Sequence, residues 1–269
     1  MSEASALPGA LHGDPGAPAR LLLLHGFMGA RDDWREKISG LGPGAACLAV
    51  DLPGHGEAAG VRVPEAAGMA AVAERLAKSL DRTGWDRAIV AGYSMGGRIA
   101  AYFAGKFPGR VAALALESAS LGLATEDERR ARQARDEALA RRLAEEPLER
   151  FVTDWYSQPL FAPMAGHGER FKALMARRCA NDPAGLAHAL RALGLGAQPD
   201  LRGAWRESAA PALLITGARD EKFAAIARDM AAARPGAAWA NVPGCGHNVH
   251  WEDPAEYTRL LRAFIEDHA

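Results

Sequence analysis

The residue best suited to do chemistry in this sequence is Ser94, at the centre of a Gly-x-Ser-x-Gly pattern that spans Gly92–Gly96. The apolar run 88–91 precedes the pattern, and the helix-like run 97–103 follows it. A strand, this pattern and a helix in succession are typical of a nucleophile elbow, a tight turn that holds the serine at the end of a sheet beside a helix N-terminus. A serine hydroxyl is a poor nucleophile or base by itself, so this prediction requires a neighbouring imidazole.

A histidine and an aspartate downstream of Ser94 have the positions that such an imidazole and its partner require. Asp220 follows the strand-like run 212–216, and His247 follows a short run that ends at Val242. Both therefore fall on loops beyond strand ends, where an open α/β sheet places its ligand chemistry. An aspartate bonded to the imidazole fixes its tautomer and stabilises the imidazolium. We expect Ser94, His247 and Asp220 to form a catalytic triad.

Other residues compete for two of these positions. His250 lies close to His247 in the sequence, but small residues before His247 allow that imidazole a closer approach to the serine. The competing acids are Asp51, Asp200 and Glu221. The first precedes the serine, which is the wrong chain order, and the last adjoins the favoured aspartate, so its side chain should point elsewhere.

The glycine-rich segment His25–Gly29 follows the first strong strand. Backbone N–H groups presented by such a loop beside an elbow can stabilise an oxyanion. We expect the donors to be the amides of Phe27 and of Met95, the residue after the serine. An ordinary strand-to-helix loop is the alternative interpretation.

Arg98 lies in the first turns of the predicted elbow helix. The helix dipole disfavours a cation there, so a compensating anion is expected. A bound anionic substrate and a salt bridge to a protein carboxylate are equally consistent with the sequence. The spacing of the charged run 126–135 is more typical of a solvated helix with i,i+4 ion pairs than of a binding site. For the pair Arg177-Arg178 the sequence does not distinguish these two roles. Trp155 is more typical of a packed core than of a ligand contact.

Short strand-like runs alternate with helical patterns along most of the chain, and these elements must position the residues above. The expected strands lie near 20–25, 46–51, 87–92, 111–117, 211–217 and 237–242, and the expected helices near 33–41, 66–82, 95–107, 223–233 and 254–267. This alternation predicts an α/β fold, with a mostly parallel central sheet flanked by helices. Residues 1–19 are compatible with an early edge hairpin.

The composition changes between about residues 120 and 208, where clear strands vanish and Ala, Arg, Glu and Leu recur with helical spacing. We expect a helical lid over the carboxyl ends of the sheet. The predicted organisation is a core formed by residues 1–120 and 209–269, with the lid at 121–208.

Composition and charge also bound the partners. A chain of 269 residues suffices for one large domain with a sizeable core. Its net charge of −1 predicts no general attraction to nucleic acid or to an anionic membrane. The three cysteines are widely spaced without a metal-ligand pattern, which favours reduced thiols. The early run Leu21–Leu24 is too short to span a bilayer, and no signal-peptide pattern precedes it, so we expect a cytoplasmic protein.

The chain resembles the α/β-hydrolase superfamily over essentially its whole length, and the order serine, acid, histidine is that of this superfamily. More narrowly, it resembles the 2-succinyl-6-hydroxy-2,4-cyclohexadiene-1-carboxylate (SHCHC) synthase family of menaquinone biosynthesis. The segments that carry the resemblance are Leu24–Gly29, Asp51–Gly56, Gly92–Arg98, Glu117–Leu123, Arg132–Gln133, Asp154–Ala162, Ala197–Leu201, Asp220–Phe223 and Gly246–His250.

The resemblance implies a lyase on a hydrolase scaffold that acts without a metal or an organic cofactor. The implied substrate is 2-succinyl-5-enolpyruvyl-6-hydroxy-3-cyclohexene-1-carboxylate, which carries several carboxylates and loses pyruvate when the triad acts as a base. The implied partner is thus a small molecule, and the protein is expected to be a monomer or a small homo-oligomer. The family's triad falls on the three residues chosen above, and its substrate-binding residues fall on Arg98, Arg132, Arg178, Tyr93 and Trp155.

Two other functions use the same fold. A serine hydrolase acting on an ester, thioester or C–C bond in a small acidic substrate would share the triad and the oxyanion hole, although a simple esterase pocket should be largely apolar. A non-catalytic ligand receptor is compatible with the fold but not favoured by an intact triad. A haloalkane dehalogenase is excluded, because the elbow residue is Ser94 and not an aspartate.

Overall fold

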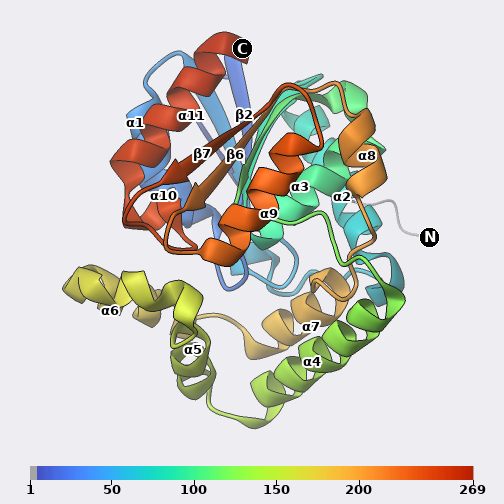
Figure 1. Cartoon of the computed structure of the whole chain (residues 1–269), viewed down its shortest axis with the longest axis vertical. Coiled ribbons are helices and arrows are strands. Elements are labelled where there is room, and N and C mark those ends of the chain that lie inside the picture. Colours follow the sequence, from blue (N-terminus) through green and yellow to red (C-terminus); the bar gives the residue numbers. More distant parts are fainter. Residues whose placement is uncertain (1–4, 269) are drawn as a thin grey trace.

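A seven-stranded sheet forms the centre of the computed structural model, which describes residues 5–268 (Figure 1). Its order is β1-β3-β2-β4-β5-β6-β7, and every neighbouring pair except β1 with β3 is parallel. The strands are β1 (Gly9–His12), β2 (Ala19–Leu24), β3 (Ala45–Val50), β4 (Ala88–Tyr93), β5 (Val111–Glu117), β6 (Ala212–Gly217) and β7 (Ala237–Val242). The predicted α/β fold with a mostly parallel sheet is confirmed.

Among residues 5–18 the structure has one edge strand and no hairpin, so the edge hairpin that the sequence left open is not formed there. Strand β1 pairs antiparallel with β3, with Gly9 opposite Val50. The reason is that β2 already pairs with β3 on one side and with β4 on the other, so the free edge for β1 belongs to β3. Residues 1–4 lie outside the described part of the chain.

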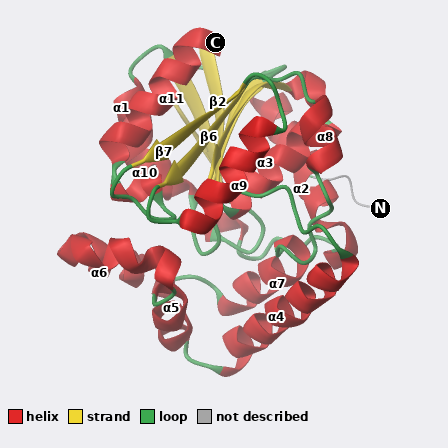
Figure 2. Cartoon of the chain, in the orientation of Figure 1, coloured by secondary structure: helices red, strands yellow, loops and turns green. Residues whose placement is uncertain are grey.

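Helices cover both faces of the sheet, as Figures 1 and 2 show. The central strands are buried on both faces and read as continuous apolar runs, which is typical of parallel sheets. One face packs against α1 (Arg35–Leu41), α10 (Val249–Glu252) and α11 (Pro254–His268). The other packs against α2 (Gly68–Thr83), α3 (Met95–Lys106), α8 (Arg202–Glu207) and α9 (Glu221–Ala232).

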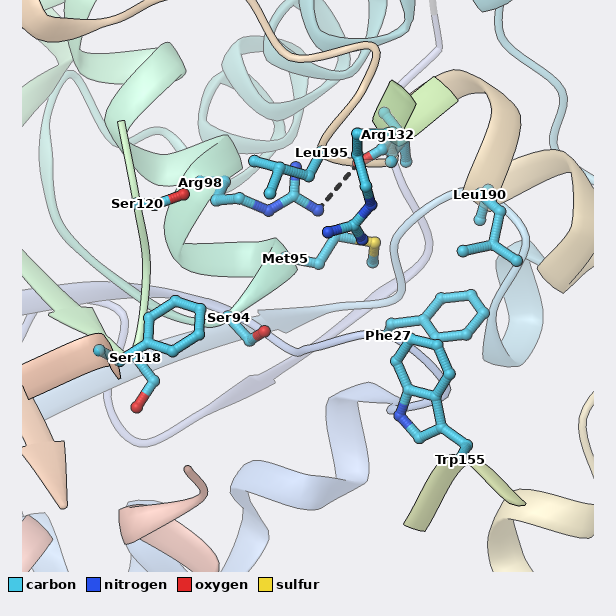
Figure 3. Close-up of a pocket in the computed structure, with 14 residues that line it drawn as sticks. Phe27, Ser94, Met95, Arg98, Ser118, Ser120, Arg132, Trp155, Leu190 and Leu195 are labelled. Atoms are coloured by element: carbon cyan, nitrogen blue, oxygen red, sulfur yellow. Dashed lines mark hydrogen bonds between the residues drawn. The ribbon is translucent and has the colours of Figure 1, made fainter. Parts of the chain in front are cut away.

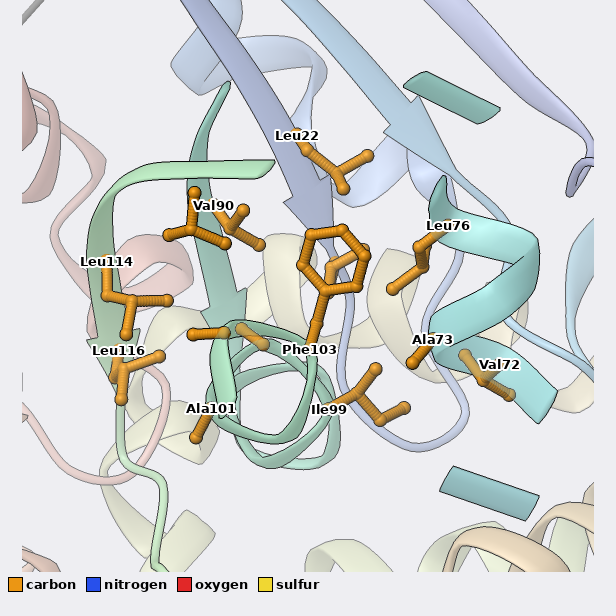
Figure 4. Close-up of a cluster of buried hydrophobic side chains, with 14 of the residues drawn as sticks. Leu22, Val72, Ala73, Leu76, Val90, Ile99, Ala101, Phe103, Leu114 and Leu116 are labelled. Atoms are coloured by element: carbon orange, nitrogen blue, oxygen red, sulfur yellow. The ribbon is translucent and has the colours of Figure 1, made fainter. Parts of the chain in front are cut away.

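The cluster drawn in Figure 4 anchors α3, the helix that follows Ser94. Ile99 and Phe103 of α3 are fully buried among apolar side chains of β2, β4, β5 and α2. Burying such side chains contributes roughly 1.5–3 kcal/mol each. The start of α3 is therefore held rigidly against the carboxyl end of β4.

Helices inserted between β5 and β6 lie beyond the carboxyl ends of the strands (Figure 1). They are α4 (Glu126–Glu145), α5 (Leu148–Tyr156), α6 (Gly168–Cys179) and α7 (Pro183–Leu193). Thr125 and Glu128 form a capping box at the start of α4, and Asp182 caps α7. Helix α8 falls within the predicted lid range 121–208, but its Trp205 is buried in the core beside the sheet.

Short 3₁₀ helices connect these elements: Arg31–Trp34, Gly56–Ala58, Glu65–Ala67, Pro108–Arg110 and Pro159–His167. Within residues 5–268, no helix combines the length and the apolar character that crossing a bilayer requires. All three cysteines are free.

Candidate active site

The elbow is a strained turn at the junction of β4 and α3. Ser94 has φ 50° and ψ −106°, a conformation that non-glycine residues rarely adopt. Its N–H donates to the Glu117 carbonyl at the end of β5, over 2.8 Å. A Cβ on Gly96 would overlap the Leu24 carbonyl, and one on Gly92 would lie 2.5 Å from the Gly96 carbonyl carbon. The glycines of the pattern are therefore required by close packing of the backbone.

The three residues predicted as a triad lie in one hydrogen-bonded series. His247 Nε2 is 3.1 Å from Ser94 Oγ, and His247 Nδ1 is 2.6 Å from Asp220 Oδ2. Asp220 and His247 are buried, and Asp220 also accepts from the Phe223 N–H at the start of α9. This geometry is suitable for transferring a proton from the hydroxyl to the imidazole.

The competing residues are engaged elsewhere. His250 donates its backbone N–H to buried Glu117, and its Nδ1 lies 2.7 Å from the same carboxylate. Asp51 pairs with Arg31 and Asp200 with Arg202. Glu221 is exposed in the first turn of α9.

Two backbone amides near Ser94 are available as donors. The N–H groups of Phe27 and Met95 have no acceptor among the described residues, and both residues line the pocket. Met95 is the first residue of α3, where helix N–H groups are unpaired by construction. The N–H of Met28, by contrast, donates to His55 Nε2 over 3.1 Å and is not available.

Two buried histidines cross-link the loops below these donors. His25 Nε2 accepts from the Leu52 N–H over 3.0 Å, as His55 Nε2 does from Met28. Each Nδ1 lies 2.8–3.0 Å from a backbone carbonyl, so each ring fits a neutral imidazole protonated at Nδ1. Burial, followed by the nearby His25, lowers the pKa of His55 to about 3. Burial likewise lowers the pKa of His25.

Ser94 opens into a pocket of about 550 Å³, including its open mouth, between the sheet and the inserted helices. Figure 3 shows the guanidinium groups of Arg98 and Arg132 close together on one side, and the rings of Phe27 and Trp155 packed together on another. The other lining residues are Met95, Ser118, Ser120, Ala189, Leu190, Leu193, Gly194, Leu195 and Phe223. No group of three or more His, Cys, Asp or Glu side chains in the described part of the chain is placed to hold a metal ion.

Arg98 faces this pocket with neutral partners. Its Nη1 donates to Gln198 Oε1 over 3.1 Å, and its Nη2 donates to the Leu193 carbonyl over 2.9 Å. No ion pair joins Arg98 to a carboxylate among residues 5–268. Burial, followed by the charge of Arg132, lowers the pKa of Arg98 to about 9, and Asp136 opposes the shift. The sequence left two explanations for Arg98, a bound anionic substrate and a salt bridge to a protein carboxylate. The salt bridge is not formed among residues 5–268.

Arg132 reaches the same pocket from α4. Its Nε donates to Asp136 over 2.7 Å, one turn further along the helix. Arg130 instead forms an exposed pair with Asp127 and does not line the pocket. Helix α4 therefore combines solvated ion pairs with one arginine directed at the site, a distinction that spacing alone did not show.

Arg178 lies outside the pocket lining. It is buried and forms a two-pronged ion pair with Asp33, at 2.7 and 3.2 Å, and its Nε donates to the Tyr156 hydroxyl. Burial alone would raise the pKa of Asp33, but the charge and hydrogen bonds of Arg178 outweigh it and hold that pKa at about 2. Asn181, close to Arg178, donates to the Met28 carbonyl. This end of α6 is thus tied to the loop that follows β2.

The predicted aromatic contacts divide in the same way. Trp155 lines the pocket and packs against Phe27, with 5.0 Å between ring centroids. Tyr93 does not line it, because its ring is buried behind the triad and packs edge-on against His247.

Sequence reasoning missed three residues near the triad or in the pocket. Phe223 lines the pocket and packs on His247, with centroids 4.5 Å apart. Glu252 accepts from the N–H groups on both sides of His247 and so braces its loop. Gln198 holds Arg98. Phe223 and Gln198 fell within segments that carried the family resemblance, which was the one available signal.

Comparisons with known proteins add to this geometry. The α/β-hydrolase fold family model matches residues 19–254. A 2-succinyl-6-hydroxy-2,4-cyclohexadiene-1-carboxylate synthase of Enterobacter sp. (strain 638) is 39% identical over 259 residues, which cover 95% of this chain and 96% of that protein. The structure of MenH from S. aureus matches with a TM-score of 0.90 and 29% identity over 99% of both chains. A malate-bound thermophilic esterase from Thermogutta terrifontis matches with a TM-score of 0.83 and 25% identity, over 98% of this chain and 94% of its own.

Proposed function

Since the chain belongs to the α/β-hydrolase fold family and, within it, to the family of SHCHC synthases, we propose that Ser94, His247 and Asp220 serve its reaction as a base. The protein is a lyase that eliminates pyruvate from 2-succinyl-5-enolpyruvyl-6-hydroxy-3-cyclohexene-1-carboxylate to form SHCHC in menaquinone biosynthesis. The elimination involves no net oxidation or reduction, and we propose that it proceeds without a cofactor.

The observation that carries the assignment of the pocket is the unpaired charge of Arg98. Two arginines, Arg98 and Arg132, face the pocket, and one carboxylate, Asp136, lies beside them. A partly buried cation without a counter-ion is costly, and a substrate carboxylate would relieve that cost through charge-assisted hydrogen bonds. A substrate with several carboxylates fits this excess of positive charge.

In the proposed reaction, Ser94 Oγ takes the ring proton beside the succinyl carbonyl as its own proton passes to His247 Nε2. Asp220 holds the other ring nitrogen and stabilises the imidazolium that forms. The electrons of the broken C–H bond form a ring double bond between C2 and C3. The existing double bond shifts from C3–C4 to C4–C5 as the C–O bond between C5 and the enolpyruvyl group breaks. The released enolpyruvate takes up a proton to become pyruvate, and no covalent enzyme intermediate is needed.

The free N–H groups of Phe27 and Met95 would receive the negative charge that develops on the succinyl carbonyl oxygen. Trp155 would pack against the substrate from the lid side. We include Tyr93 and Arg178 as residues that support the site from behind, since neither lines the pocket in this structure.

The test is to supply the purified protein with the enolpyruvyl substrate, made in situ by the preceding enzyme, and to follow pyruvate release together with the absorbance of the new conjugated diene. We expect wild-type protein to form both rapidly and the Ser94→Ala variant to fall to the spontaneous rate. A wild-type rate equal to the spontaneous reaction would contradict the proposal.

A serine hydrolase that acts on a small acidic ester is the second candidate, because the similar T. terrifontis esterase shares the fold and was solved with malate bound. The two functions differ at Ser94, since a hydrolase forms an acyl-enzyme and the proposed lyase does not. Mass spectrometry of protein quenched during turnover should show unmodified Ser94. An adduct on Ser94 would favour the hydrolase chemistry.

A further inference from the structure

Arg98 is held by two neutral acceptors that come from distant parts of the chain. Gln198 is almost fully buried, with 1% of its surface exposed, and its Oε1 accepts from Arg98 Nη1. The second acceptor is the carbonyl of Leu193, the last residue of α7, where helix carbonyls lack internal partners. An arginine has five N–H donors, so these two bonds orient the guanidinium without occupying it.

The orientation of the Gln198 amide is determined by its second bond. Its Nε2 donates to the Ser120 carbonyl over 3.1 Å, in the loop after β5. The nitrogen is therefore committed to Ser120, and the oxygen must face Arg98. A glutamate has almost the same shape, but its carboxylate cannot donate to Ser120 and would neutralise Arg98.

We propose that Gln198 is a positioning residue that aims Arg98 at a substrate carboxylate while leaving its charge unpaired. The inference rests on the proposed function insofar as the pocket takes an anionic substrate. The specificity for anions thus depends on an amide being present where a carboxylate of nearly equal size would also fit. An internal ion pair at this position would compete directly with the substrate.

The decisive variant is Gln198→Glu, compared with Gln198→Met, which removes the acceptor without adding charge. Gln158→Glu is the matched control. Gln158 is half-buried, and its Nε2 likewise donates to a backbone carbonyl, that of Trp155. Unlike Gln198, it forms no hydrogen bond with an arginine in the described part of the chain. The control therefore loses the same kind of bond and gains the same charge.

For Gln198→Glu we expect KM for the enolpyruvyl substrate to rise about 10- to 100-fold with kcat changed by less than about threefold, as for loss of a charge-assisted contact made in both ground and transition states. Gln198→Met should raise KM less, and Gln158→Glu should leave it near the wild-type value. The rate at which neutral phenylmethanesulfonyl fluoride labels Ser94 should be unchanged in all three variants, because that reagent does not use Arg98.

A wild-type KM in Gln198→Glu would overturn the proposal. An equal rise in KM in Gln198→Glu and Gln198→Met, accompanied by slower labelling of Ser94, would also overturn it. If Gln198→Glu does not fold, a wild-type KM in Gln198→Met would overturn it.

A separate measurement distinguishes this outcome from failure of the proposed function. Succinate should slow the labelling of wild-type Ser94 and should protect Gln198→Glu much less. That result would support the role of Gln198 even if wild-type protein released no pyruvate from the enolpyruvyl substrate. Equal protection of the two proteins would count against it.

Discussion

Arg98 illustrates at the residue scale how a site can retain an unpaired charge. The first turns of a helix disfavour a cation, and the described chain supplies it only with an amide and a carbonyl. Ile99 and Phe103 are fully buried and anchor α3. A shift of the helix is therefore not available to carry the Arg98 guanidinium out of the pocket. In the function proposed above, a substrate carboxylate that pairs with Arg98 would offset the cost of leaving this charge unpaired.

We therefore expect Arg98→Ala to lower kcat/KM for the enolpyruvyl substrate by about 10- to 100-fold, mainly through KM. The fold should persist, because Arg98 forms no buried ion pair whose partner would be stranded. Steady-state kinetics and a thermal melt test both expectations. Arg130→Ala, which removes an exposed arginine, is the control. An unchanged kcat/KM in Arg98→Ala would remove this residue from the site.

At the scale of elements, the loop after β2 is rigid because His55 and His25 cross-link it to the loop after β3. Both imidazoles are buried and accept a backbone N–H, which they can do only when neutral. Since the pKa of His55 is lowered to about 3, the unfolded chain takes up a proton below about pH 6.5 that the folded protein does not. The contribution of neutral His55 to the free energy of unfolding is thus complete above that pH and is lost progressively as the pH falls toward 3.

His55→Gln tests this account, because a glutamine oxygen can accept from Met28 but does not titrate. Between pH 7 and pH 5 we expect the wild-type protein to lose about 2 kcal/mol more unfolding free energy than the variant does. Urea unfolding at the two pH values measures the difference. His12→Gln, on the edge strand, should keep the wild-type pH dependence. Parallel losses in His55→Gln and wild type would show that His55 is not the titrating group.

On the scale of the whole molecule, a buried ion pair joins the helices inserted between β5 and β6 to the core around the sheet. Arg178 of α6 meets Asp33 of the core, and Asn181 meets the Met28 carbonyl beside the free amide of Phe27. These contacts tie α6 and the residues after it to the core and to the loop after β2, which carries Phe27 and Met28. In this arrangement Arg178 does not line the pocket.

Removing one member of the pair should be more harmful than removing both. We expect Arg178→Met to destabilise the protein by about 3–5 kcal/mol, because Asp33 would be left buried and unpaired, and Asp33→Leu with Arg178→Met to recover part of the loss. Urea unfolding of the single and double variants gives the coupling energy. In wild type this contribution is present above about pH 4 and is lost as the pH falls toward 2, since the pKa of Asp33 is lowered. Additive losses would contradict the coupling.

The sequence alone determined the features that depend on local pattern. Strand-like apolar runs that alternate with helical patterns predicted the parallel sheet. The Gly-x-Ser-x-Gly pattern predicted the turn at Ser94, because backbone crowding there requires glycine two residues before and two residues after the serine. The positions of Asp220 and His247 followed from chain order and strand ends, and the fold brings both within hydrogen-bonding distance of their expected partners. Each of these features depends mainly on a few residues that are close together in the sequence.

Only the tertiary structure decided which arginines face the pocket and what holds them. Arg98 and Gln198 are 100 residues apart, and Arg178 and Asp33 are 145 apart, so no local pattern relates either pair. Arg130 and Arg132 share one helix, yet one faces solvent and the other the pocket, because the packing of α4 on α7 sets the rotation of α4. The interaction between two charges depends on the distance between them in the folded protein. For residues far apart in the sequence, the order of residues along the chain does not specify that distance.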